Sequence, residues 1–137
     1  ELRTGDTASS VRVRQRERPP HALVTTPESL SVLLSYAETG AWLADVRAVV
    51  VDEWHELLGT KRGVQLELAL ARLRALSPAL RTWGLSATIA NLDEARDVLL
   101  GPSAAGALVR GTDDKRIAID SIRPATLERF PWAGHLG

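Results

Sequence analysis

The chain has 137 residues, of which 45% are hydrophobic and 25% charged, and its formal net charge is zero. This composition is that of a globular domain, and the balanced charge excludes an affinity for polyanions that rests on net charge alone. The absence of cysteine excludes disulfides, thiolate metal sites and cysteine nucleophiles. No apolar run approaches the roughly 20 residues that a membrane-spanning helix needs, so no membrane partner is predicted.

An arginine-rich segment stands near the start of the chain. After a turn at residues 5–7, residues 8–18 predict a helix that Pro19 and Pro20 end, since proline lacks the backbone N–H that a helix needs. The arginines of this segment are consistent with a basic face that meets phosphates and equally with an ordinary solvated helix face.

A strand and a second helix follow. Residues 22–24 are a short apolar run that predicts a buried strand. Thr26 suits the N-cap and Pro27 the first position of a helix that runs to about Glu38 and ends at Gly40. One face of this helix is expected to carry Leu30, Leu33, Leu34 and Ala37.

The clearest strand covers residues 46–51, because a continuous run of valines is typical of a central strand in a parallel sheet. A second strand is predicted over residues 82–85, with Trp83 in the core, and Asn91 is expected to cap a helix that runs through Leu100. Short strands near residues 107–110 and 116–122 and a linker at 124–131 complete the prediction. Between the two main strands, residues 64–76 predict an amphipathic helix whose inward face carries Leu66, Ala69, Leu70 and Leu73.

Strands that alternate with helices predict an α/β fold, with a parallel sheet flanked by helices. Polar segments follow three of the predicted strands, at residues 25–27, 52–53 and 86–88. Ligands of such sheets bind at the carboxyl ends of the strands. We therefore expect these three segments to lie on the same rim of a single sheet.

Two adjacent carboxylates, Asp52 and Glu53, close the valine strand. One can hold Mg²⁺ beside a triphosphate, while the other polarises an attacking water. His55 can relay the presence of nucleotide to a neighbouring loop. The alternative is purely structural, because acidic residues are also favoured in the first turn of a helix.

The same residues carry a family resemblance. Residues 49–59, VVVDEWHELLG, resemble the DExH motif of superfamily 2 helicases, and Ser86-Ala87-Thr88 resembles the SAT motif of that family. Residues 25–30, TTPESL, and 3–7, RTGDT, resemble two of its nucleic-acid-contacting segments. The stretches DEWHELLGTKRGVQ, WGLSATIANLDEA and ERFPWAGHLG resemble the Lhr-like branch, and within it the bacterial ligase-associated DNA-damage-response DEXH-box helicases.

The resemblance implies a partial RecA-like motor domain that lacks its phosphate-loop strand. Residues 1–122 would be the C-terminal part of the first such domain, and residues 123–137, with Trp132, a linker and the start of the second. Trp54, at the variable position of DExH, is expected to pack rather than to react. The resemblance further implies Mg²⁺ binding by Asp52, water activation by Glu53, and coupling of nucleotide state to DNA movement by His55, Ser86, Ala87 and Thr88. It also implies DNA contacts by Gly5, Asp6, Thr7, Thr26, Pro27 and Glu28. Lys61 and Arg62 are candidates for further contacts to the DNA backbone, and equally for a surface patch at the start of a helix.

By the same resemblance, the parent protein would be an ATP-dependent DNA helicase that uses ATP and Mg²⁺, acts on a single-stranded tail and duplex, and serves DNA repair in the bacterial cytoplasm, at the nucleoid. A DNA ligase and a repair nuclease would be partners, together with the remainder of the helicase chain. The phosphate loop G-x-x-x-x-G-K-[ST] and the arginine finger are absent from these 137 residues, which start without Met. The chain is therefore expected to be an internal fragment that is inactive alone.

Other functions fit the residues less well. A nucleic-acid-binding or interaction module that kept the fold without catalysis is the main alternative, although an intact Asp52, Glu53 and His55 argue against a decayed site. A nucleotide-binding domain without a role on DNA is a further alternative. A zinc protease would need a second histidine where Gly59 stands, and a serine hydrolase would need the G-x-S-x-G elbow around Ser86.

Overall fold

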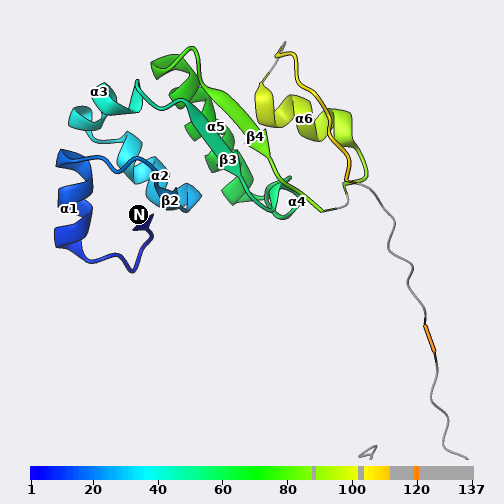
Figure 1. Cartoon of the computed structure of the whole chain (residues 1–137), viewed down its shortest axis with the longest axis horizontal. Coiled ribbons are helices and arrows are strands. Elements are labelled where there is room, and N and C mark those ends of the chain that lie inside the picture. Colours follow the sequence, from blue (N-terminus) through cyan, green and yellow to red (C-terminus); the bar gives the residue numbers. More distant parts are fainter. Residues whose placement is uncertain (88, 102–103, 112–118, 121–137) are drawn as a thin grey trace, which may run out of the picture.

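The computed structural model describes residues 1–87, 89–101, 104–111 and 119–120, and Figure 1 shows its elements. Helices and short parallel strands alternate along the chain, as the sequence predicted. The elements are β1 (Leu2–Arg3), α1 (Ser9–Glu17), β2 (Val24–Thr25), α2 (Pro27–Leu34), the 3₁₀ helix η1 (Ala37–Thr39), α3 (Gly40–Leu43), β3 (Ala48–Val51), α4 (Trp54–Leu57), α5 (Lys61–Leu76), β4 (Arg81–Gly84) and α6 (Leu92–Leu100).

The strands form two parallel pairs rather than one sheet. β1 pairs with β2, and β3 pairs with β4 in a register that sets Val50 opposite Trp83. No backbone ladder joins the two pairs within the described residues, which corrects the expectation of a single continuous sheet. The pairs are connected through their helices instead, because α2 packs on α5. The predicted α/β class, with parallel strands flanked by helices, is confirmed.

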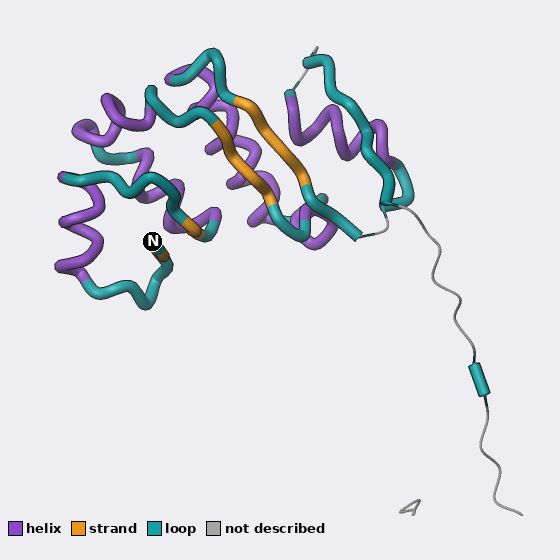
Figure 2. The backbone as a smooth tube through the Cα atoms, in the orientation of Figure 1, coloured by secondary structure: helices purple, strands orange, loops and turns teal. Residues whose placement is uncertain are grey.

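The core lies on one side of the β3–β4 pair. Figure 2 shows α5 along that side and α6 next to β4. The predicted inward face of α5 is confirmed, since Leu66, Ala69, Leu70 and Leu73 are all buried. The main cluster of buried apolar residues consists of Val51, Trp54, Leu66, Leu70, Ala95 and Leu99.

Trp83 does not belong to this core. Its exposed fraction is 61%, and that of Val50 opposite is 58%. Successive side chains of a strand point to opposite faces, so Trp83 shares the face of Val50 while Val51 points to α5. The prediction of a core tryptophan was wrong because composition does not tell which face of a strand is covered.

The second predicted helix is shorter than its apolar pattern suggested. α2 ends at Leu34 rather than near Glu38, because Tyr36 is extended and the Ser35 hydroxyl donates to the carbonyl of Val32 at 2.7 Å. Gly40, expected to end the helix, begins α3. The buried Thr39 hydroxyl donates at 2.8 Å to the Leu33 carbonyl, which also accepts the Tyr36 N–H at the end of α2, and thereby stabilises the turn.

The residues after α6 differ from the prediction. Residues 104–111 have no regular secondary structure, so the strand predicted at 107–110 was wrong. A Cβ atom at Gly106 would overlap the Leu100 side chain, which shows that this segment packs against α6 rather than beside a strand. Most of the predicted strand at 116–122, the linker at 124–131 and Trp132 lie outside the described residues. Within the described part, no helix has the length and apolar character to cross a membrane.

Candidate functional site

The two carboxylates stand in a short, tightly held loop at the end of β3. Glu53 adopts a left-handed backbone conformation (φ 50°), which a non-glycine residue takes at a cost of about 1–3 kcal/mol. Leu85 holds both sides of the loop: its N–H donates to the Val51 carbonyl at 2.8 Å, and its carbonyl accepts from the Trp54 N–H at 3.0 Å. The loop therefore presents exposed Asp52 and Glu53 side chains on a fixed base.

His55 joins the carboxylate loop to the segment after β4. Its Nδ1 lies 3.1 Å from the Ser86 hydroxyl and 3.3 Å from the Ala87 N–H, and it is 3.4 Å from the Glu53 carboxylate. When Nδ1 lacks a proton it can accept from Ala87, and when it carries one it can donate to Glu53. The predicted coupling residues Ser86 and Ala87 thus lie beside the acidic pair, while Thr88 is outside the described residues.

The donor set suits a hydrated divalent cation. The Asp52 carboxylate is exposed, and one of its oxygens accepts the Glu53 N–H at 3.0 Å. The described residues contain no cluster of three or more metal-ligand side chains. Magnesium needs no such cluster, because it retains water and binds through one or two carboxylates and substrate phosphates. Asp52 therefore fits the role of a single Mg²⁺ ligand.

Most of the residues predicted to contact nucleic acid surround a separate groove, which has a volume of about 560 Å³. The Thr4–Thr7 turn forms one border, with the Thr4 N–H donating to the Thr7 hydroxyl at 2.9 Å. Thr26 forms the other, as the N-cap of α2 that accepts from the Ser29 N–H. Thr7 and Pro27 shape these two borders without lining the groove. The lining residues are Arg3, Thr4, Gly5, Asp6, Arg12, Thr26, Glu28, Ser29 and Val32.

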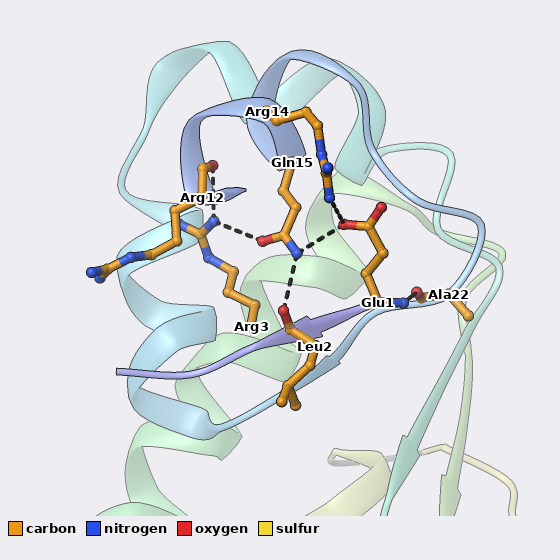
Figure 3. A network of polar contacts seen from close by, with 7 residues as sticks. All are labelled: Glu1, Leu2, Arg3, Arg12, Arg14, Gln15 and Ala22. Carbon is orange, nitrogen blue, oxygen red and sulfur yellow. Dashed lines mark hydrogen bonds and ion pairs between the residues drawn. The ribbon is translucent and has the colours of Figure 1, made fainter. Parts of the chain in front are cut away.

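A buried polar network supports this groove (Figure 3). The Arg3 guanidinium, only 2% exposed, donates to the Arg12 carbonyl at 3.1 Å and to the Gln15 amide oxygen at 3.3 Å. Gln15 in turn donates to the Leu2 carbonyl and to the Glu1 carboxylate, both at 3.0 Å. Burial lowers the pKa of Arg3, and its Nε has no hydrogen-bond partner in the described structure. The groove thus has a largely buried cation in its wall.

Lys61 and Arg62 lie at the start of α5, and Arg62 reaches the α2 side of the groove. The Arg62 Nε donates to the Glu28 carboxylate at 2.6 Å, and this contact lowers the pKa of Glu28. Lys61 is exposed. Gly63 is required by packing, because a Cβ atom there would overlap the Leu57 carbonyl.

Sequence reasoning missed the residues that hold these sites in place. Gln15 was one polar residue within an arginine-rich helix, and Leu85 acts through its backbone alone. Only Arg3, which stands directly before the predicted turn at residues 5–7, carried a signal that could have been followed. The structure brings the DExH segment together with Ser86 and Ala87, and the RTGDT and TTPE segments together at the groove. The prediction that all three polar segments end strands of a single sheet was wrong, because residues 25–27 lie at the end of a strand of the other pair.

The family follows from these sites together with a direct comparison. The model of the DEAD/DEAH box helicase family matches residues 1–95, and the chain belongs to this family. Within it, the chain is similar to Lhr-type helicases. It is 47% identical over 102 residues to the ATP-dependent helicase Lhr-Core of Methanothermobacter thermautotrophicus, covering 74% of this chain and 12% of that protein. It is 40% identical over 101 residues to the Lhr helicase/uracil glycosylase of Escherichia coli, covering 73% and 6%.

Solved structures agree with this assignment. The chain superimposes with a TM-score of 0.68 on the Mycobacterium smegmatis helicase Lhr bound to ssDNA and AMP-PNP, at 43% identity over 74% of this chain and 13% of that one. The DUF1998 helicase MrfA matches with a TM-score of 0.60 at 26% identity, over 72% and 16%. The resemblance to Lhr-like helicases and the partial RecA-like fold are confirmed, and the chain spans a small part of these relatives.

Proposed function

We propose that this chain is the part of an ATP-dependent DNA helicase that contains the hydrolytic carboxylates and one side of the DNA track. The observation that carries the proposal is the contact of His55 with Ser86 and Ala87, next to Glu53. Because His55 contacts both the acidic loop and the segment that follows β4, it can transmit a change in one of them to the other. The similar M. smegmatis helicase, bound to ssDNA and AMP-PNP, supports the same ligands here.

The proposed hydrolysis divides between the two carboxylates. Asp52 would hold Mg²⁺, which neutralises charge on the transferred phosphoryl group when bound. Glu53 accepts a proton from the attacking water and orients it. The left-handed backbone of Glu53 sets the direction in which its side chain leaves the loop, and His55 lies close enough to respond when Glu53 gains that proton.

The proposed DNA track is the groove between the Thr4–Thr7 turn and the start of α2. Backbone N–H groups, hydroxyls and arginines are donors that suit phosphates, and such contacts carry no sequence information. Gly5, Asp6, Thr7, Thr26, Pro27 and Glu28 would follow the strand, with Lys61 and Arg62 beside them. A motor that must move along any sequence needs a grip of this kind.

The intact protein is proposed to act in DNA repair in the bacterial cytoplasm, with a ligase and a nuclease as partners, as the ligase-associated resemblance implies. Residues 1–122 would complete its first motor domain and residues 123–137 would lead to the second. We expect the fragment alone to be inactive, because these residues contain neither a phosphate loop nor an arginine finger.

The test is Glu53→Gln in the intact protein. Removing a general base should lower DNA-stimulated ATP hydrolysis by about 100-fold or more, while nucleotide affinity stays near the wild-type value. Glu56→Gln is the matched control, since Glu56 is also exposed and lies 3.5 Å from the other nitrogen of His55. Retained turnover in Glu53→Gln would show that another group activates the water.

A further inference from the structure

The residue at the variable position of the DExH motif, Trp54, is fixed by three contacts. It is 2% exposed within the main core. Its backbone N–H donates to the Leu85 carbonyl at 3.0 Å, which ties it to the end of β4. Its indole Nε1 donates at 3.0 Å to the carbonyl of Ala95 in α6. One residue thus connects the acidic loop to two other elements.

The contact with α6 depends on a tightly packed joint. Ala95 is 4% exposed, and its small side chain lets the indole reach the helix backbone. On the β4 side, a Cβ atom added to Gly84 would lie 2.5 Å from Leu99 and 3.9 Å from the Trp54 ring. Close packing of this kind transmits a displacement instead of absorbing it. The position of the Trp54 ring therefore depends on where α6 lies.

Trp54 follows directly after Glu53, whose left-handed conformation is strained and must be held by its neighbours. The Asp52–Glu53 loop has two backbone anchors, the Val51 carbonyl and the Trp54 N–H, both bonded to Leu85. The first belongs to a regular strand. The second belongs to a four-residue helix, α4, which has little stability of its own. The indole bond to α6 is the side-chain hydrogen bond of Trp54 that helps to fix this second anchor, beside the burial of its ring in the core.

We propose that Trp54 is a positioning residue for ATP hydrolysis: its indole bond to Ala95 holds the Glu53 carboxylate in the orientation that activates water. This inference rests on the proposed function. An indole is required because, among aromatic side chains of similar shape, it supplies an N–H at the ring edge. Phenylalanine fills most of the same space without that donor.

The test is Trp54→Phe in the intact helicase, with Trp54→Leu as a second variant that is also apolar and also lacks the indole donor. We expect kcat for DNA-stimulated ATP hydrolysis to fall about tenfold, because small misplacements of a catalytic group are costly, while KM and ATP affinity change by less than about twofold. Thermal melts establish that each variant is folded. Trp42→Phe is the matched control, since the Trp42 Nε1 has no hydrogen-bond partner within the described residues, and its kcat should equal that of the wild type.

Two outcomes overturn the proposal. One is a kcat of folded Trp54→Phe within about twofold of the wild type, which would leave the bond without a role in turnover. The other is a fall in kcat and in the number of ATP-binding sites together, in proportion to lost folded protein, which would make Trp54 structural only. Failure of the proposed function is distinguishable, because the wild-type protein itself would then show no DNA-stimulated hydrolysis.

Discussion

The two halves of the described structure are held together in different ways. The first region, residues 1–45, contains three buried polar side chains: Arg3 and Gln15 are hydrogen-bonded to each other, and Thr39 is bonded to the backbone at the end of α2. The second region, residues 46–101 without residue 88, contains the apolar cluster around Leu70. The groove proposed for DNA lies in the first region, and the carboxylate loop in the second.

The difference matches what each region is proposed to do. A site that must hold a carboxylate in place to within fractions of an ångström needs a base that does not deform, and a close-packed apolar core provides one. A groove for a polyanion benefits from a cation in its wall, and a hydrogen-bonded network is the means of burying most of that cation. The comparison predicts that substitutions in the second region lower stability through lost packing. Substitutions in the first region should lower it by leaving buried polar groups without partners.

Leu70→Ala should have the largest effect. Leu70 is fully buried at the centre of the second region, so truncation should lower the stability of α5 by about 2–5 kcal/mol. Hydrogen exchange of the α5 amides in the intact protein measures this change. The control is Leu68→Ala on the same helix, where 69% exposure predicts a change within about 0.5 kcal/mol. Equal effects at both positions would mean that the core does not lie where we place it.

Gln15→Leu tests the first region. The substitution keeps the side-chain size but removes the acceptor of Arg3 and the donor to the Leu2 carbonyl, at a cost of about 1–3 kcal/mol. Faster amide exchange in the Thr4–Thr7 turn and weaker DNA binding are expected. Val13→Ala, a partly exposed position of the same helix, should leave both unchanged. If Gln15→Leu instead stabilised the turn, apolar packing would matter there as it does in the second region.

The sequence predicted the second region better than the first. Valine runs, the leucine period of α5 and the Asn91 cap depend on local pattern, and the structure confirms them. The placement of the acidic pair beside Ser86 followed from the rule that parallel strands end on the same rim. In the first region the end of α2 depends on a contact between Thr39 and Leu33 that no periodicity reveals.

The other features that the sequence did not predict share one cause: each depends on what a residue contacts in the fold rather than on the type of the residue. Trp83 is an apolar strand residue whose face happens to be uncovered. The residue type of Arg3 suggests a surface cation, but its side chain is buried against Gln15. Trp54 was expected to pack, and it does, but its hydrogen bond to Ala95 joins segments that are distant in sequence.

The smallest effect is expected where the two regions meet, at the ion pair of Arg62 and Glu28. The hydrogen bond from Arg62 lowers the pKa of Glu28 below its ordinary value of 4.5, so the pair stabilises the folded state above that pH. This contribution is lost as the pH falls through the lowered pKa. Because both side chains are exposed, the loss should stay below about 1 kcal/mol and shrink further in salt.

Amide exchange in α2, followed through the acid range in the intact protein, measures this loss, and Glu28→Gln should remove the pH dependence there while leaving α5 unchanged. A similar acid response in α2 of the variant would place the titrating group elsewhere. A loss much larger than expected would mean that the two regions depend on this pair for their contact, rather than on the packing of α2 against α5, and the comparison between two independently stabilised regions would then fail.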